Sequence, residues 1–408
     1  MFSQSSPHAR YRLYTSAASY VPQLYAPDDA IERFEAEICR RFDVAGAVCV
    51  PRARTGLYLT LAEIMKGRRK VIMSPLTIVD VVNAVLLAGG IPVFCDICRS
   101  SCSIDPGQAE SLIDDQTAAI LITHLHGQTA RAGVFRDMCA RHGIRLIEDA
   151  AQAFGASEGK QHLGTIGDAG VYSFGFFKNL TTWRGGMVVS NDQELIKSIR
   201  SRIRKLSRFT RADLVTTAVS GLIVDLSTWP PFFSRVTYSI LRRNIEWLDR
   251  RLDPERGARR LTTMPKSYFC QMRQSQAAMG LRQLSRVDAD TNERQVRARR
   301  YNDGLDGICG IIKPERTDGH SNTYTYFPIQ IADRKGLLRH ARARKRDFAA
   351  QHLRNCADLP EFAELFRDCP NARRTASELV LLPTYPRYPL PEVELNIEVI
   401  REFVTDQI

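Results

Sequence analysis

The sequence contains no apolar run that approaches the ~20 residues needed to span a bilayer. Its first eight residues, Met1 to His8, lack the apolar stretch that a signal peptide carries. Internal repeats and low-complexity tracts are absent as well. We therefore expect a globular protein that remains in the cytoplasm, and 408 residues are enough for one large domain and one smaller domain.

Motifs for nucleic-acid binding are also missing. The formal net charge is +12, but no zinc finger, RNA-recognition motif or helix-turn-helix signature accompanies it. Ten cysteines fit the reduced thiols of an intracellular chain. Cys95, Cys98 and Cys102 lie close together, yet no fourth ligand is near them, so we expect no metal ion. The expected anionic partners are small phosphate-bearing molecules, and most of the basic excess is solvated surface.

The apolar pattern of the first half predicts an α/β fold. Strand-like runs alternate there with helix-like segments such as 134–142, and this alternation is typical of a largely parallel sheet covered by helices. Beyond about residue 253, a long charged helix over 275–305 and an alternating strand over 324–331 predict an α+β domain. We expect a large cofactor-binding domain over residues 1–255 and a small carboxyl-terminal domain over residues 256–408.

Lys178 is the first candidate for catalysis. It follows a predominantly apolar run that begins at Gly170, and an apolar environment disfavours the ammonium form of a lysine. Its pKa falls, so that the amine can attack an aldehyde and form a Schiff base. The alternative is a lysine that lays its stem on apolar neighbours and keeps its charge in water. The residues upstream favour the first interpretation.

Asp149 ends a short apolar strand, 146–149, about thirty residues upstream of the lysine. In open α/β sheets ligands bind outside the carboxyl ends of the strands, so Asp149 and Lys178 are expected to share that crevice. A pyridoxal 5'-phosphate (PLP) site needs this pair, because the lysine holds the aldehyde and a carboxylate keeps the ring nitrogen protonated. The alternative role for Asp149 is to cap the alanine-rich segment that follows.

A phosphate site is the third requirement. The segment from Pro51 to Ala62 is typical of a strand-to-helix junction, where backbone N–H groups bind phosphate. Arg54 and Thr55 add a cation and a hydroxyl, and Ser173 adds a hydroxyl near the lysine. Together the three elements predict a PLP site.

These residues carry a resemblance to a known family. The segment from Val71 to about Asp192 closely resembles the sugar aminotransferases of the DegT/DnrJ/EryC1/StrS type, and weaker similarity extends over most of the chain. The matching stretches occur in the family's order: Met73-Ser74-Pro75-Leu76-Thr77, Asn83 to Phe94, His124 to Gln128, Glu148 to Ala153, and Ser173 through Lys178-Asn179 to Ser190. The resemblance implies the PLP-dependent transferase type I (aspartate aminotransferase-like) fold.

The resemblance also implies roles for individual residues. Lys178 would be the Schiff-base lysine and proton shuttle, and Asp149 the partner of the ring nitrogen. Gln152 would bind near the phenolic oxygen of the cofactor, while Ser173, Arg54 and Thr55 would hold its phosphate. The implied protein is a homodimer that moves an amino group, from glutamate, to a keto sugar carried on a nucleotide or a lipid.

Two alternatives remain open at this point. Relatives that carry histidine in place of the lysine are sugar dehydratases, and the lysine here favours transamination. From a different class, the chain could be a regulatory or scaffold protein that keeps the aminotransferase fold without catalysis. The set of Asp149, Gln152, Ser173 and Lys178 speaks against this reading.

The chain departs from the family in two places. Ile78 stands where many relatives have an aromatic residue that stacks on the cofactor ring, so apolar contact would replace stacking. An insertion of roughly forty residues, 207–250, precedes Ser267 to Gln271, where relatives carry a Gly-x-Asn-x-Arg stretch of the second subunit. The Gly, Asn and Arg of that stretch are all absent.

The insertion itself has a helical apolar face, then aromatic residues, then a second helix-like stretch over 236–248. Arginines crowd both flanks. Its apolar positions and aromatic tip are Leu214, Val215, Ala218, Val219, Leu222, Ile223, Leu226, Trp229, Phe232 and Phe233. Two interpretations stay open: a helix pair that packs on its own domain or the second subunit, and an in-plane contact with an anionic membrane.

Overall fold

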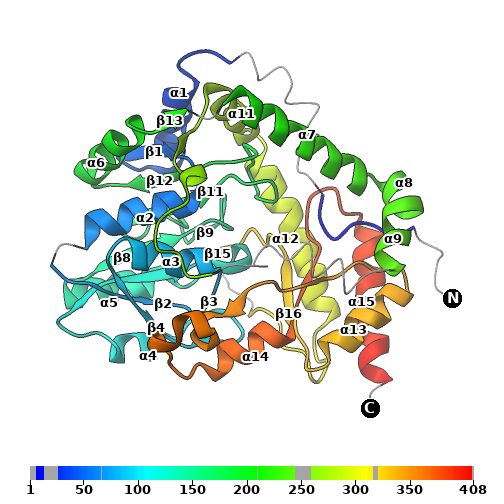
Figure 1. Ribbon diagram of the computed structural model, residues 1–408. Helices are drawn as coiled ribbons and strands as arrows, with labels where there is room; N and C mark the ends of the chain where they lie inside the picture. The colour runs from blue at the N-terminus through cyan, green and yellow to red at the C-terminus, as the bar shows by residue number, and fades with distance from the viewer. Residues whose placement is uncertain are drawn as a thin grey trace.

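The computed structural model describes residues 6–12, 26–65, 67–208, 210–243, 259–315 and 320–406. A seven-stranded sheet in the order β1-β12-β11-β8-β7-β2-β4 occupies the left half of the view in Figure 1. Neighbouring strands from β11 to β4 are parallel, whereas β12 is antiparallel to both β1 and β11. This confirms the largely parallel sheet. The strands are β1 (Gly46–Val50), β2 (Lys70–Met73), β4 (Ile91–Phe94), β7 (Thr117–Thr123), β8 (Arg145–Asp149), β11 (Ala169–Ser173) and β12 (Gly186–Ser190).

Helices cover both faces of this sheet because successive strand residues point to opposite sides. Val48 and Val50 of β1 belong to the core under one set of helices, and Ala47 and Cys49 to the core under the other. The first set is α2 (Ala53–Ile64), α3 (Val79–Leu87) and α6 (Gln193–Arg204); the second is α1 (Ala30–Phe42), α5 (Ala132–His142) and α11 (Gln274–Leu284). Within the described residues, no helix is both long and apolar enough to cross a membrane.

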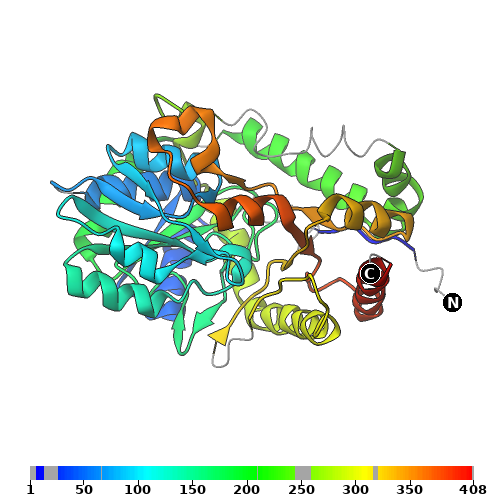
Figure 2. The same cartoon turned by 90° about the horizontal axis from the view of Figure 1, so that it is seen from below.

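A third apolar cluster forms the core of the carboxyl-terminal part, which lies beside the sheet with α12 in yellow and α15 in dark red (Figure 2). Its elements are α12 (Val287–Gly304), β16 (Phe327–Gln330), α13 (Arg334–Ala343), β17 (Ala349–Ala350), β19 (Leu379–Leu382) and α15 (Leu390–Thr405). The helix α14 (Pro370–Glu378) precedes β19 and packs on the core of the sheet through Ala372. The division near residue 255 stays a prediction, and that residue lies outside the described ranges.

Two expected elements differ from the observed ones. The helix expected over 275–305 is two helices, because α11 packs on α1 while α12 packs on α15, and the chain turns between them. The strand expected over 324–331 begins only at Phe327. Tyr324 has a left-handed backbone (φ 42°), and the Thr325 N–H donates to the carbonyl of His126, so this segment bonds to the 124–128 loop instead.

Short strands and turns complete the described fold. The two-residue strands are β3 (Leu76–Thr77), β5 (Ile97–Cys98), β6 (Ser103–Ile104), β9 (Ser157–Glu158), β10 (Gln161–His162), β13 (Ser207–Arg208), β14 (Cys270–Gln271), β15 (His320–Ser321) and β18 (Arg354–Asn355), and α4 spans Pro106–Ser111. Short 3-10 turns span Leu125–Gly127, Lys266–Tyr268 and Cys356–Asp358, and a 3-10 segment with a kink at Phe362 spans Pro360–Leu365. Of these, β3 positions the site, because Ile78 and α3 follow it directly.

The insertion is helical, as its apolar spacing predicts. It forms α7 (Arg211–Thr228), α8 (Pro230–Phe232), a π-helical turn (Phe233–Thr237) and α9 (Tyr238–Arg243), and residues 244–250 lie outside the described ranges. A capping box between Thr210 and Asp213 starts α7. The helix runs from the neighbourhood of α11 toward α8 and α9, which lie near α13 and α15 (Figure 1).

The two faces of α7 differ. Ala218 and Val224 pack inward against Trp183 and Phe176, close to Lys178 in the chain. Val215, Val219, Leu222, Ile223 and Leu226 are exposed. The aromatic residues after the helix also differ in exposure. Trp229 is exposed, whereas Phe233 is buried against Ala9 and Tyr238. The expectation that Phe233 belongs to an exposed tip is therefore wrong.

Candidate active site at the carboxyl edge of the sheet

Lys178 lies in a tight turn just after β11. Its backbone N–H donates to the carbonyl of Gly175 at 3.2 Å, and Thr182 closes the loop by donating to the carbonyl of Phe174 at 3.0 Å. Burial lowers the pKa of Lys178 to about 8; the charge of Asp149 opposes this shift and that of Arg54 adds to it. A sizeable fraction of the amine is therefore neutral near physiological pH, as a nucleophile requires.

Asp149 ends β8, directly beside β11, where Val171 is its register partner. Its carboxylate accepts a hydrogen bond from the N–H of Ala151 at 3.0 Å. Burial raises the pKa of Asp149, and the Ala151 N–H and the charge of Lys178 offset part of that rise. The structure thus brings the expected lysine and carboxylate close enough to interact electrostatically.

Glu148, the neighbour of Asp149, points to the other face of the strand and has a different role. Its buried carboxylate accepts from the backbone N–H groups of Gly164 (2.8 Å), Ile166 (2.7 Å) and Gly167 (2.7 Å). His124 Nε2 lies 2.8 Å from it, and the Nδ1 of the same ring accepts from the Ala130 N–H, which assigns the proton to Nε2. This network anchors the strand end that carries Asp149.

Gln152 and Ser173 are two further expected cofactor contacts at this edge of the sheet. The Gln152 Oε1 accepts from the N–H of His126 at 3.0 Å, which orients the amide so that its NH2 group points the other way. A Cβ placed on Gly175 would lie 3.8 Å from Ser173 Oγ and 4.0 Å from Lys178 Cγ. The Gly175 turn therefore holds the serine hydroxyl and the lysine stem on the same side.

The start of α2 holds the two other expected phosphate contacts. Arg54 forms an ion pair with Asp80 and donates to the Tyr268 hydroxyl at 2.9 Å. The buried Thr55 hydroxyl donates to the Tyr268 carbonyl at 2.8 Å. Ile78 is half-buried at the start of α3, two residues before Asp80. Tyr268 is thus the residue that the sequence did not predict here.

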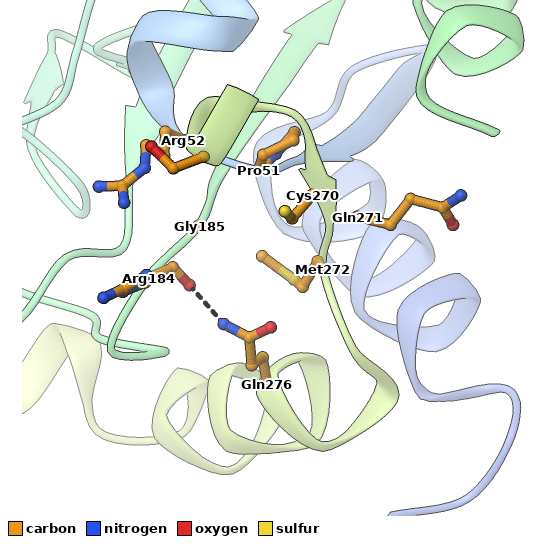
Figure 3. A pocket seen from close by; sticks show the side chains of 9 residues that line it. Pro51, Arg52, Arg184, Gly185, Cys270, Gln271, Met272 and Gln276 are labelled. Carbon is orange, nitrogen blue, oxygen red and sulfur yellow. Dashed lines mark hydrogen bonds between the residues drawn. The ribbon is translucent and has the colours of Figure 1, made fainter. Parts of the chain in front are cut away.

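Tyr268 belongs to the segment 267–271, and other residues of this segment line a pocket beside α2 (Figure 3). In the view of Figure 3, Arg52 and Arg184 extend toward the same side, and Gln276 donates to the Arg184 carbonyl at 2.9 Å. The Arg52 guanidinium lies 5.1 Å from the centre of the Tyr268 ring. Burial, followed by the charges of Arg54 and Arg184, lowers the pKa of Arg52 to about 10.

Three arginines therefore gather at one helix start, an arrangement that suits a phosphate group. The sequence prediction named only Arg54 among them. The sequence did contain a signal for the other two arginines. Arg52 stands two residues before Arg54, and Arg184 directly precedes the matched glycine pair Gly185-Gly186.

A second pocket lies at Lys178 itself and joins distant parts of the chain. It is lined by Tyr11, Arg12, Phe176, Phe177, Lys178, Arg294, Thr325, Tyr326 and Tyr385. The ring centres of Tyr11 and Phe177 are 4.4 Å apart, so the amino-terminal segment forms one wall. The sequence prediction missed Tyr11, Arg12, Arg294 and Tyr326, because no local pattern links them to Lys178.

The cysteine cluster lies away from these pockets. The Cys98 thiol lies 3.2 Å from Asp105, and burial raises the pKa of Cys95 and Cys102 to about 12. Within the described residues, no group of three His, Cys, Asp or Glu side chains is arranged to hold a metal ion.

The residues at the sheet edge fit PLP. A buried amine of lowered pKa, a buried carboxylate, an oriented amide, a serine hydroxyl and a cation-rich helix start match the groups that the cofactor presents. When bound, PLP supplies an aldehyde for the amine and an electron-withdrawing ring. The fold and the site together define a PLP-dependent transferase of the type I class.

Residues 22–222 and 252–401 match the DegT/DnrJ/EryC1/StrS aminotransferase family, so the chain belongs to this family and is a PLP-dependent aminotransferase. The spore coat polysaccharide biosynthesis protein SpsC of Bacillus subtilis is 27% identical over 385 residues, 92% of this chain and 89% of that protein. The dTDP-3-amino-3,4,6-trideoxy-alpha-D-glucose transaminase of Micromonospora megalomicea is 27% identical over 389 residues, 92% and 90% of the two chains.

Among solved structures, the aminotransferase PseC of Helicobacter pylori, involved in the biosynthesis of pseudoaminic acid, has a TM-score of 0.75. It is 18% identical to this chain, and the match covers 99% of this chain and 100% of that one. At this identity the likeness shows the fold alone. The expected type I fold is confirmed.

Proposed function

We propose that this aminotransferase moves an amino group from glutamate to the carbonyl of a keto sugar carried on a nucleoside diphosphate, in glycan or amino-sugar biosynthesis. The observation that carries the proposal is the buried Lys178 amine of lowered pKa next to Asp149. Relatives named for polysaccharide biosynthesis and for a dTDP-sugar transaminase support the sugar acceptor. The cation cluster at the start of α2 supports phosphate-bearing ligands.

In this proposal each residue has one task. Lys178 Nζ would hold the cofactor and, once the amine of the donor has displaced it, would be free to take the proton from the α-carbon of the donor. The Asp149 carboxylate keeps the ring nitrogen protonated, and its burial strengthens that interaction. The Gln152 amide NH2 would donate toward the phenolic oxygen of the cofactor, while Ser173 and the start of α2 would bind the phosphate. Ile78 contributes apolar contact to the ring.

Spectroscopy tests the proposal against its two alternatives. The purified protein loaded with PLP should be yellow, its absorption band should shift on addition of L-glutamate, and a keto-sugar nucleotide should then be converted to an amino sugar. A band that does not respond to amino donors would favour a scaffold. A deoxygenated keto sugar formed without any amino product would favour a dehydratase.

The proposal includes a homodimer, as the family resemblance implies, and a peripheral position on the inner face of the membrane for a cytoplasmic protein. The apolar row on α7 supports the membrane contact, since Ile223 and Leu226 are 62% and 54% exposed. Exposed Arg204, Lys205 and Arg208 precede the helix, and an anionic bilayer attracts such residues by about 1 kcal/mol each. A lipid carrier, the alternative to a nucleoside diphosphate, would fit this position, because the inner face of α7 contacts the Lys178 loop.

A further inference from the structure

Arg294 on α12 is a buried cation with few hydrogen bonds. Its side chain lines the same pocket as Lys178 and the residue is only 6% exposed. The single hydrogen bond of its guanidinium within the described residues is a long one, from Nη1 to the Thr325 carbonyl at 3.4 Å. Its Nε is buried and has no partner within those residues. An arginine side chain presents five N–H donors, so most of this donor capacity is unused.

The charges around Arg294 do not neutralise it. The charge of Asp290, one helical turn earlier, raises the pKa of Arg294, but the ion pair of Asp290 is with Arg286 at 4.0 Å. Within the described part of the chain, no carboxylate lies within 4.0 Å of the Arg294 guanidinium. Burial lowers the pKa of Arg294 to about 10, and the group remains charged at neutral pH. A buried charge of this kind needs an anionic partner.

Arg297, one turn further along α12, shows what a structural arginine looks like in the same surroundings. Its Nε donates to the Tyr388 carbonyl at 2.7 Å, its Nη1 to the Glu293 carbonyl at 2.7 Å and its Nη2 to the Pro386 carbonyl at 2.6 Å. Every nitrogen of Arg297 has a partner. Arg294 is equally buried and lines the Lys178 pocket, but within the described residues most of its donors have no partner.

We infer that Arg294 binds the α-carboxylate of the amino donor. This inference rests on the proposed function and extends it by assigning a donor-specificity residue. In an amino acid the α-carboxylate is bonded to the same carbon as the reacting amine, so its binding site must share a pocket with Lys178. A guanidinium matches a carboxylate with two parallel hydrogen bonds.

The phosphate groups of a sugar nucleotide have other cations available. Arg52 and Arg184 line a separate pocket beside the start of α2, and Arg54 remains for the phosphate of the cofactor. Arg12 shares the Lys178 pocket, but it lies on the amino-terminal segment and forms an ion pair with Asp225 of α7 at 3.7 Å. Arg294 is therefore the side chain in this pocket with both the burial and the unused donors that a substrate carboxylate needs.

The test compares Arg294→Met, Arg294→Lys and Arg300→Met in the PLP-loaded enzyme. Arg300 is an exposed arginine of the same helix and provides the matched control. The amino donors are L-glutamate, L-glutamine, which lacks the side-chain carboxylate, and L-isoglutamine, whose α-carboxylate is an amide. The readout is the dissociation constant from the absorption shift. Calorimetry with uridine diphosphate gives a separate measure of nucleotide binding.

Arg294→Met should weaken the binding of both L-glutamate and L-glutamine by about 10- to 100-fold, the effect of losing a charge-assisted hydrogen-bonded pair. Binding of L-isoglutamine, already weak in the unmodified enzyme, should change little. Arg294→Lys should bind L-glutamate and L-glutamine with an affinity between those of the unmodified enzyme and Arg294→Met. Lysine keeps the positive charge but cannot form two parallel hydrogen bonds. Arg300→Met should bind all three donors as the unmodified enzyme does, and uridine diphosphate should bind all the proteins equally.

Two results would overturn the inference. Equal affinity of the unmodified enzyme and Arg294→Lys for L-glutamate would show that the two parallel hydrogen bonds of the guanidinium are not used. The lysine variant keeps the test decisive even if Arg294→Met does not fold. Weaker binding of uridine diphosphate with unchanged binding of L-glutamate would assign the arginine to the sugar nucleotide. If the unmodified enzyme itself gives no shift with any donor, the proposed function fails first, and the inference that depends on it fails too.

Discussion

The sheet edge around Lys178 and the outer face of α7 differ in the kind of side chain that is buried or exposed. At the edge, polar groups are buried and paired, as Glu148 is with three backbone N–H groups and His124. On α7, apolar groups such as Ile223 are exposed. Apart from Arg294, the polar groups named in the first region have their partners within the chain, whereas the second region implies a partner outside it. Substitutions at the sheet edge should therefore change the rate of amino transfer, and substitutions on α7 should change the binding of the protein to membranes.

The largest effect is expected for Lys178→Ala. Without the amine neither the attachment of the cofactor nor the proton transfer has a group to perform it, so amino transfer should be undetectable. Circular dichroism should show an unchanged fold, because Lys178 lies in a turn. Turnover at the level of the unmodified enzyme would remove Lys178 from its proposed role.

Asp149→Asn should reduce the rate on the order of 10²-fold or more, since a few kcal/mol of charge stabilisation at the ring nitrogen acts directly on the barrier. Cofactor binding should persist through the phosphate contacts. Steady-state kinetics and a PLP titration of the same preparation separate the two quantities. Near-normal turnover in this variant would mean that Asp149 does not contact the ring nitrogen.

The lowered pKa of Lys178, about 8, predicts a pH dependence for the cofactor-free protein. Only the neutral amine reacts with an aldehyde, so the rate of PLP incorporation should rise between pH 7 and pH 9 by about tenfold, with a midpoint near pH 8. Stopped-flow absorbance after mixing with PLP measures it. A midpoint near the ordinary lysine value would show that the amine is not shifted.

The smallest effect on turnover is expected on α7. Changing Val219, Ile223 and Leu226 to serine removes exposed side chains and should leave the rate in solution within about twofold. The unmodified protein should co-sediment with anionic vesicles and be partly released by high salt, and the variant should stay in solution.

A matched control changes two exposed apolar residues elsewhere, Val134 and Phe366, to serine, and this protein should still bind vesicles. If the α7 variant binds vesicles as well as the unmodified protein does but sediments as a monomer where the latter is a dimer, a second copy of the chain covers this face instead of lipid.

The sequence predicted those parts of the structure whose signals are local. The sheet alternation, the helical insertion and the motif residues Asp149, Gln152, Ser173 and Lys178 each follow from contiguous stretches. Arg294 and Tyr268 could not be predicted, since their roles depend on contacts with residues over a hundred positions away. The ion pair of Arg54 with Asp80 was missed for a similar reason, because it depends on how α2 and α3 pack.

The most direct test of the account is reduction of the PLP-loaded protein with borohydride, followed by peptide mapping with mass spectrometry. The account predicts one modified peptide, with the cofactor attached to Lys178, and no labelled peptide after reduction of Lys178→Ala. A cofactor attached to another lysine, or no reducible adduct in the unmodified protein, would contradict it.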